Sequence, residues 1–360
     1  FYHKPIETPR KEEVTYFFDK GIHFAGKIDL KDGESIYVDK DAYVYGTIGA
    51  KSAKNIRIFG NGVMDGGTEE RVGLHCYEPY INGNARFYNC QNVAISGVGF
   101  TNSAIWCVNI FHCLGVSIDG IKVFGQWRYN TDGIDIDCCR YVTVSDCIIE
   151  TGDDAIAIRG HRTPLKNKEH PCEYVTISNC VLSSQSHTIR IGVGGGLIRH
   201  IRLSNLMIVS GSPAIGIMSS YHGRGCTTIE DVTISNVTAT DTARVLSLIE
   251  GANVPLKNIV LENFTVETCG IMNLCADFPE SAQDVTLRNF KITLKDCPTP
   301  VTEKDHRIHG KAWFRAKNIN GLKLENFVVH GVQNNFSKWE NGAFLFEGCD
   351  DKVLTNVTIE

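Results

Sequence analysis

Short runs in which every second residue is Val, Ile or Leu recur along the chain from residue 92 onward. Each run has a small or polar residue, an aliphatic residue, a residue such as Thr or Ser, a second aliphatic residue and a polar end. The copies occupy residues 92–97, 115–120, 141–146, 174–179, 200–205, 231–236, 258–263, 284–289 and 321–326. An apolar residue at every second position predicts a β-strand with one buried face.

Most copies follow one another at intervals of 23 to 33 residues, which is the period of a solenoid. No helical pattern separates them. We therefore predict an all-β fold, a right-handed parallel β-helix of about ten coils, as a single domain over residues 1–360. Because the open end of a solenoid needs a cover, residues 1–50 are expected to form an N-terminal cap and the first coils. Residues 51–360 are expected to form the coils that follow.

Many copies end in Asn, a residue that tolerates the left-handed conformation of a turn. Stacked Asn side chains can also hydrogen-bond from coil to coil. The residues concerned are Asn179, Asn205, Asn236, Asn263, Asn289, Asn326 and Asn356. Three of them begin glycosylation triplets, and if their side chains point inward they can carry no glycan. On that assumption the triplets give no information about secretion.

Three strand-like runs in the middle of the chain carry polar residues at matching positions. When the runs are aligned on their Ile residues, Asp132, Asp154 and His187 share one position. Adjacent parallel strands lie about 4.8 Å apart, so stacked coils are expected to bring these side chains together on one sheet. The runs are residues 130–136, 152–158 and 186–192.

Carboxylates dominate this stretch. Asp153 is adjacent to Asp154, so their side chains are expected to diverge. Together with Asp132 they bring three carboxyl groups close to one another, and like charges should raise the pKa of at least one. Glycoside hydrolysis uses a protonated acid beside ionised carboxylates. Calcium binding or turn capping is the alternative interpretation of an Asp pair taken alone.

The same residues resemble a known family. Asn-Thr-Asp-Gly at 130–133, Gly-Asp-Asp at 152–154 and Ser-His-Thr leading to Ile-Gly at 186–192 are similar to motifs of the polygalacturonase family of glycoside hydrolases, family 28. Residues 102–106, Asn-Ser-Ala-Ile-Trp, resemble the run that precedes them. The resemblance covers roughly residues 20 to 330. It implies an inverting hydrolase of a carbohydrate such as pectin that needs no metal or other cofactor.

The resemblance also implies individual roles. Asp153 would be the general acid, and Asp132 and Asp154 would position and activate the attacking water. His187 corresponds to the family histidine, and Asn130 opens the first motif and is a candidate for substrate binding.

One run departs from the family. Where the family has Arg-Ile-Lys for the substrate carboxylate, this chain has Gly216 and Met218 in place of the two cations. Polygalacturonate and other glycans therefore both stay open as substrates. The Ile alignment places Asp135, Ala157, Arg190 and Gly216 in one outward column, and Asp137, Arg159, Gly192 and Met218 in the next.

This alignment offers replacement cations. We expect Arg190 and Arg159 to contact the substrate, with Asp135 in the same groove and small neighbours leaving Arg190 room to reach a sugar. Neutralisation of the Asp cluster by Arg190 is the alternative. Candidate sugar contacts beyond these are Trp127, Tyr129 and His222.

The resemblance implies a carbohydrate substrate as the partner, and composition argues against several other partners. A net charge of −5 argues against nucleic acid, and no apolar run reaches the length of about 18 residues that a membrane span needs. The 14 Cys include no Cys-x-x-Cys pair, so a zinc site is not expected. Buried free thiols favour the cytoplasm. The first residues do not form a signal peptide, and secretion after removal of one is the alternative.

Two other functions fit the same pattern. In a polysaccharide lyase, the Asp cluster would bind calcium and Arg190 or Arg159 would abstract the proton. The third interpretation is a non-catalytic solenoid that binds carbohydrate. The sequence gives neither the sugar and linkage, nor endo or exo action, nor the oligomeric state.

Overall fold

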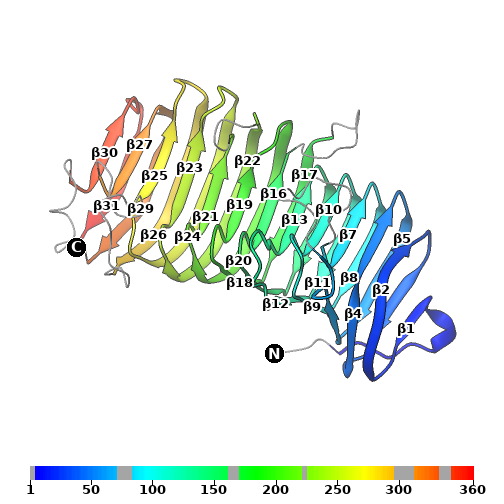
Figure 1. The fold of residues 1–360 in the computed structure, drawn as a ribbon. Coiled ribbons are helices and arrows are strands. Elements are labelled where there is room, and N and C mark those ends of the chain that lie inside the picture. Colours follow the sequence, from blue (N-terminus) through cyan, green and yellow to red (C-terminus); the bar gives the residue numbers. More distant parts are fainter. Residues whose placement is uncertain (1–4, 71–82, 161–169, 221–224, 296–311, 332–341) are drawn as a thin grey trace. The chain divides into compact units, whose positions relative to one another are not determined.

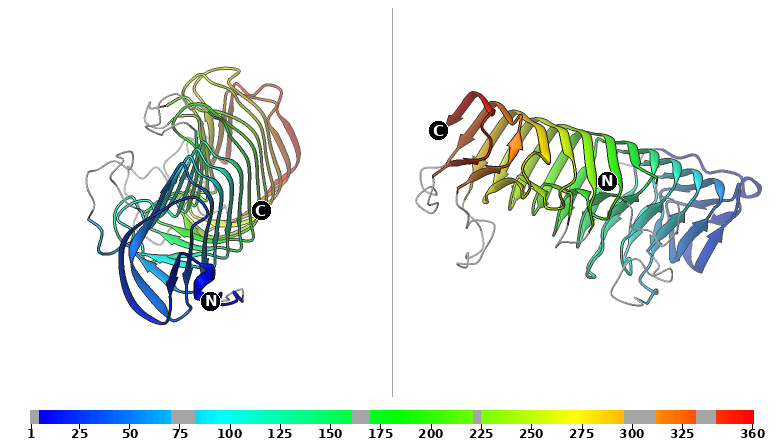
Figure 2. Two further views of the ribbon diagram at one scale, coloured as in Figure 1. Left: turned by 90° about the vertical axis from the view of Figure 1, so that its right-hand side faces the viewer. Right: turned by 90° about the horizontal axis from the view of Figure 1, so that it is seen from above.

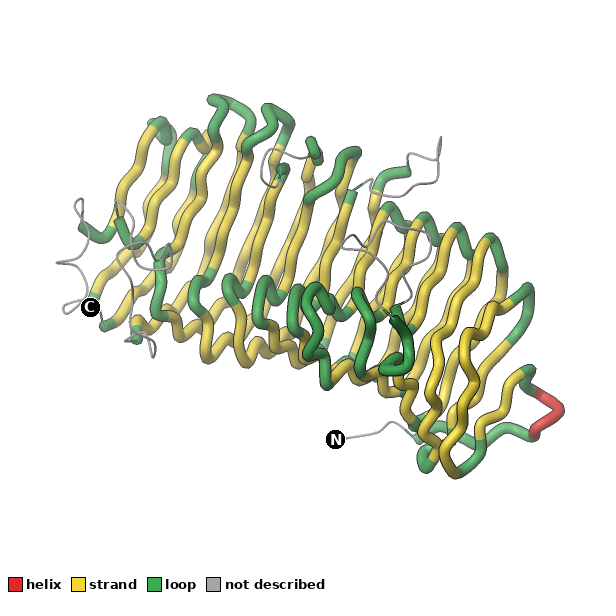
Figure 3. The backbone as a smooth tube through the Cα atoms, viewed as in Figure 1, coloured by secondary structure: helices red, strands yellow, loops and turns green. Residues whose placement is uncertain are grey.

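A computed structural model describes the chain except residues 1–4, 71–82, 161–169, 221–224, 296–311 and 332–341. The chain divides into two compact units, residues 1–181 and 182–360. Strands make up nearly all of the regular structure in both (Figure 3). The helix described is a single 3₁₀ turn, η1 (Lys11–Glu13). In the described part of the chain, no helix is both long and apolar enough to span a membrane.

The first unit is a coil of three parallel stacks (Figure 1). One stack contains β1 (Tyr16–Phe18), β3 (Ser35–Val38), β5 (Lys54–Gly60), β8 (Gln91–Ser96), β11 (Leu114–Asp119), β14 (Arg140–Ser145) and β17 (Cys172–Ser178). The second contains β2 (Gly21–Leu30), β4 (Ala42–Lys51), β6 (Val63–Asp65), β9 (Gly99–Thr101), β12 (Lys122–Phe124) and β15 (Ile148–Thr151). The third continues from the end of β4 through β7 (Ala85–Tyr88), β10 (Val108–Phe111), β13 (Ile134–Asp137) and β16 (Ile156–Arg159).

The second unit alternates short strands with long ones that bend around two sides of the coil. The short strands are β18 (Val181–Ser184), β19 (Ile189–Gly192), β21 (Ile215–Met218), β23 (Leu246–Glu250), β25 (Met272–Ala276), β27 (Phe314–Lys317), β28 (Ile319–Asn320) and β30 (Phe344–Glu347). The longer strands are β20 (Leu197–Gly211), β22 (Thr228–Thr242), β24 (Leu256–Thr268), β26 (Ala282–Leu294), β29 (Lys323–His330) and β31 (Val353–Ile359). In the views of Figure 2, successive strands within each unit lie one behind another. The predicted all-β parallel β-helix is confirmed.

The period-two pattern sets both the core and the register. In β13 and β16, Ile134 pairs with Ile156 and Ile136 with Ile158, and all four side chains are buried. The alternate residues of these strands, such as Asp135, point to the other face, as expected for a pleated strand. The predicted columns are confirmed inside each unit, because Asp135 pairs with Ala157 in the first and Arg190 with Gly216 in the second.

The Asn ladder forms in the second unit, but on the surface. Asn236 Nδ2 donates to Asn205 Oδ1 at 3.1 Å, and Asn263 Nδ2 donates to Asn236 Oδ1 at 3.0 Å. The chain of amides continues through Asn289 to Asn356. All of these residues have positive φ, as predicted, yet their side chains are exposed. The inward orientation assumed from the sequence is therefore wrong, because the residue sits at a corner where the side chain projects away from the core.

The described cysteines are free thiols, and most are buried. In the first unit Cys113 Sγ points to the carbonyl of Phe87 at 3.6 Å, and Cys139 Sγ points to that of Ile110 at 3.3 Å. Among the residues that the structure describes, Cys226 is exposed and Cys269 and Cys275 are half-buried. The thiols thus fill corner positions in successive coils, as the sequence predicts.

Candidate active site

Asp132 and Asp154 hold the same place in two consecutive coils of the first unit. The backbone amide of Gly133 donates to the carbonyl of Asp154 at 2.9 Å, and the amide of Ile134 donates to Ala155 at 3.0 Å. Each aspartate thus stands two residues before the first Ile of its strand. Both side chains are buried, so the Ile alignment correctly predicts their proximity.

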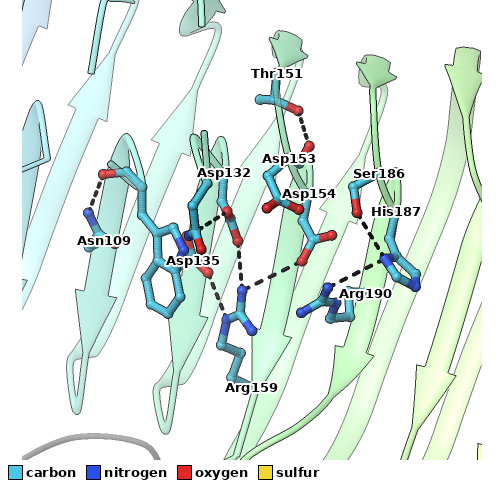
Figure 4. A network of polar contacts seen from close by, with 12 residues as sticks. Asn109, Asp132, Asp135, Thr151, Asp153, Asp154, Arg159, Ser186, His187 and Arg190 are labelled. Carbon is cyan, nitrogen blue, oxygen red and sulfur yellow. Dashed lines mark hydrogen bonds and ion pairs between the residues drawn. The ribbon is translucent and has the colours of Figure 1, made fainter. Parts of the chain in front are cut away.

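A guanidinium lies between these carboxylates (Figure 4). Nη2 of Arg159 is 2.7 Å from Oδ2 of Asp132 and 3.6 Å from Oδ2 of Asp154. Nε of the same residue donates to Oδ1 of Asp135 at 2.8 Å. One cation therefore contacts three carboxylates, each of which is almost completely buried. Such charge-assisted bonds are shorter and stronger than neutral ones.

Arg159 is covered rather than exposed to a groove. Its residue is 1% exposed, and its Cζ lies 4.4 Å from the centre of the Trp106 ring. Trp106 is itself buried, so its ring packs against the guanidinium and shields it from solvent. The predicted strand register places Arg159 on the outward face of β16, but at Arg159 this face is buried and not exposed to solvent.

The charge balance perturbs Asp132. Burial, followed by the neighbouring carboxylates of Asp135 and Asp154, raises the pKa of Asp132 well above its ordinary value, and the Arg159 guanidinium opposes that rise. Three carboxylates beside one cation in a buried site cannot all carry charge at low cost. The predicted effect of like charges is thus present at this position.

Asp153 differs from its neighbour in exposure. It is partly exposed where Asp154 is buried, as expected for adjacent side chains that diverge. Thr151 Oγ1 donates to the carbonyl of Asp153 at 2.6 Å, and the amide of Asp153 donates to Thr131 at 3.4 Å. The backbone at Asp153 is therefore held at both ends while its carboxyl group can meet a ligand.

The loop before β13 supplies one further contact. Asn130 adopts a φ of 62° and its Nδ2 donates to Oδ1 of Asp132 at 3.4 Å. Trp127 and Tyr129 are 72% and 74% exposed. Trp127 Nε1 donates to Asn102 Oδ1 at 3.2 Å. Asn130 is thus placed to orient Asp132, and the two rings are accessible, which is what a sugar contact requires.

The second unit carries the predicted histidine and the second arginine. His187 Nδ1 lies 3.3 Å from Ser186 Oγ and 3.5 Å from Nη2 of Arg190 (Figure 4). Since a guanidinium only donates, Nδ1 is the acceptor of this contact. Both His187 and Arg190 are 8% exposed.

Gly216, on the strand after Arg190, has a specific neighbour. A Cβ on Gly216 would lie 2.4 Å from Cδ2 and 3.2 Å from Nε2 of His187. The imidazole therefore occupies the space that the missing side chain leaves. The sequence led us to expect that Gly216 would leave room for Arg190, and the structure gives that room to His187 instead. Met218 is buried.

A protein-family model matches most of this chain. The model described as glycosyl hydrolases family 28 matches residues 11–295. The chain belongs to this family.

Relatives of known name agree with the assignment. A polygalacturonase of Juniperus ashei is 25% identical over 255 residues, which cover 61% of this chain and 50% of that protein. A probable endo-xylogalacturonan hydrolase A of Emericella nidulans is 23% identical over 257 residues, covering 63% of this chain and 60% of that protein. The chain thus spans about half of the first relative. The family 28 exopolygalacturonase of Yersinia enterocolitica has the same fold, with a TM-score of 0.60 at 15% identity over 95% of this chain and 72% of that chain.

The resemblance to family 28 drawn from the motifs is therefore confirmed. His222, expected as a sugar contact, lies outside the described residues. The placement of His187 relative to the carboxylates stays a prediction, because the two belong to different units. Sequence reasoning did not find Trp106 as the support of Arg159. Its position directly before the buried run at 107–111 was the available signal.

Proposed function

We propose that this family 28 chain is an inverting glycoside hydrolase that acts on a pectin-type glycan related to galacturonan. The observation that carries the proposal is the buried pair of carboxylates, Asp132 and Asp154, beside the partly exposed Asp153. That difference in exposure separates a water-activating pair from an acid that can reach a leaving group. The names of the relatives, polygalacturonase and xylogalacturonan hydrolase, support the class of substrate.

The proposed reaction is a single displacement. Asp153 donates a proton to the glycosidic oxygen as the bond from that oxygen to the anomeric carbon breaks. A water held by Asp132 and Asp154 attacks the anomeric carbon from the opposite side, and its proton passes to a carboxylate of that pair. A base whose pKa is raised toward the working pH is also a stronger base, which suits Asp132.

The substrate-binding part of this site differs from the family pattern, in which the strand after the histidine carries two cations. Gly216 and Met218 bring no charge, whereas Arg190 lies beside His187 on the preceding strand. We infer that Arg190 supplies the positive charge for an acidic sugar, with Trp127 and Tyr129 as accessible aromatic faces. A neutral or substituted residue at one subsite is compatible with this arrangement.

The lyase interpretation is less favoured by the geometry. Calcium would be held by the carboxylates of Asp132 and Asp154, but the guanidinium of Arg159 lies between them. Among the residues that the structure describes, no group of three His, Cys, Asp or Glu side chains is arranged to hold a metal ion.

The test is a screen of polygalacturonate, xylogalacturonan and neutral glycans with the anomer of the first product followed by proton NMR. The proposal expects an inverted product and no unsaturated sugar absorbing in the ultraviolet. Asp153→Asn should lower kcat by about 10²- to 10⁴-fold while the thermal midpoint is unchanged. The matched control is Glu150→Gln, which neutralises an exposed carboxylate in the same segment. A retained anomer, an unsaturated product or full activity of the Asn variant would refute the proposal.

A further inference from the structure

The guanidinium of Arg159 is buried against an aromatic ring and carboxylates of the first unit. Trp106 covers one face at 4.4 Å, Asp135 receives Nε at 2.8 Å, and Asp132 receives Nη2 at 2.7 Å. The Arg159 side chain is 2% exposed. Burial of this side chain argues against the sugar contact that its column had suggested.

We propose that Arg159 is a positioning residue, which Asp135 and Trp106 anchor and which holds the carboxylates of Asp132 and Asp154 in place for the attacking water. The proposal rests on the hydrolase function proposed above, and Arg159 acts on the reaction only through the two aspartates.

The division of labour among the donors supports this role. Nε is used for Asp135, which sits on β13 opposite Ala157, a residue whose methyl group carries no donor or acceptor. Nη2 is left for Asp132 and Asp154. Each of these aspartates lies two residues before the first residue of its strand. A planar guanidinium presents its donors in a fixed fork. Fixing one edge on Asp135 therefore fixes the direction of the bonds at the other edge.

The electrostatic part follows from the same contacts. Without Arg159, the buried carboxylates of Asp132, Asp135 and Asp154 would lose the cation that contacts all three. Asp153 adds a further negative charge that acts on Asp132, and the Cys107 thiol lies close enough to Asp135 to feel its charge. Asp137 pairs with Arg159 in the strand register. Removing the guanidinium should therefore make Asp132 harder to ionise.

The experiment compares Arg159→Met and Arg159→Lys with the wild-type chain on the glycan that the wild type cleaves. We expect the Met variant to lose kcat by about 100-fold or more while KM changes less than about 3-fold, as for the loss of a group that acts in the transition state. The acidic limb of its pH profile should move to higher pH by about one pH unit. The Lys variant, which keeps the charge without the fork, should fall between the two.

The matched control is Arg140→Met. Arg140 also pairs with a buried acid, with its Nε 2.9 Å from Glu173 Oε1, but its described contacts do not include the Asp cluster. This control should lose stability while its pH profile stays that of the wild type. A raised KM with unchanged kcat in the Arg159 variants would assign a substrate contact instead, and a wild-type profile in both would overturn the proposal.

A second readout does not depend on activity. The side-chain carboxyl of Asp132 can be followed by ¹³C NMR on aspartate-labelled protein and assigned by its absence in Asp132→Asn. Its titration midpoint should move to higher pH in the Arg159→Met variant, and in Arg159→Lys if the Met variant does not fold. An unmoved midpoint contradicts the inference. If the wild-type chain cleaves no glycan but the Asp132 midpoint still moves in the Arg159 variant, only the proposed function is contradicted.

Discussion

The imidazole of His187 lies directly over Gly216, so close that a methyl group on the glycine would stand 2.4 Å from Cδ2 of the ring. Gly216→Ala should therefore displace His187 from its contacts with Ser186 and Arg190. Because the family resemblance implies a catalytic role for His187, we expect kcat on the cleaved glycan to fall about 10-fold or more, since a small misplacement of such a group is costly. Steady-state kinetics and thermal unfolding measure the two effects.

Gly195→Ala is the matched control for that substitution. A Cβ at Gly195 meets nothing within 4 Å, so the change should leave both the kinetics and the midpoint near wild type. If Gly216→Ala is as active as the wild type and folds equally well, the position of His187 over the glycine does not matter for catalysis.

Asp132 links stability to pH. Because the pKa of its carboxyl is raised in the folded state, its contribution to stability is fully present below the ordinary Asp pKa. That contribution is lost as pH rises through the raised value. Asp132→Asn removes this loss, so the variant should be inactive yet more stable at pH 7 than the wild type. Thermal midpoints from about pH 3.5 to 8, a range that begins near the ordinary pKa of Asp, test this. A variant that is less stable at pH 7 contradicts it.

Arg190 should matter for binding more than for folding. Arg190→Ala removes a cation beside His187, so KM for an acidic glycan should rise about 10-fold, the loss expected for one charged contact. The midpoint should change little. Arg202→Ala, which removes an exposed cation paired with Asp231, is the control. A drop in midpoint with unchanged kinetics would assign Arg190 a structural role.

The surface ladder allows the backbone and the side-chain contributions to be separated. Asn263 bonds to Asn236 and accepts from Asn289 while its φ is 60°. Asn263→Gly should lose only the ladder bonds, about 1 kcal/mol each. Asn263→Ala should lose about 1 to 2 kcal/mol more for the left-handed backbone. Chemical denaturation compares the two, and equal losses would show that the conformation costs nothing.

Much of this molecule follows from the alternation of Ile and Val. It predicts the coils and the register that sets Asp132 beside Asp154, because burial of one face leaves a strand little freedom to slip. The motifs at 130–133, 152–154 and 186–192 predict the family. Exposure is another matter. The pattern places Arg159 and Asp135 on the outward face of their strands, but nothing in it tells that this face is buried around a guanidinium.

The turn positions show the same limit from the opposite side. Asn at the end of each repeat predicts the positive φ, which is a local property, but whether its side chain faces core or solvent depends on the corner of the coil. The exchange between His187 and Gly216 is also non-local. A sequence shows a small residue where a cation was expected, and only the packed coils show which neighbour takes the space.

The rate at which the buried thiols react can be used to measure local opening of the coils. A thiol reacts as its thiolate, and burial raises the pKa of Cys113 in the first unit and of Cys349 in the second. Modification by an alkylating reagent should therefore be fast at the exposed Cys226, whereas at the buried cysteines of the described chain it should wait for the local coil to open. Mass spectrometry of the labelled peptides over time would then measure how often each coil opens locally, without any engineered label.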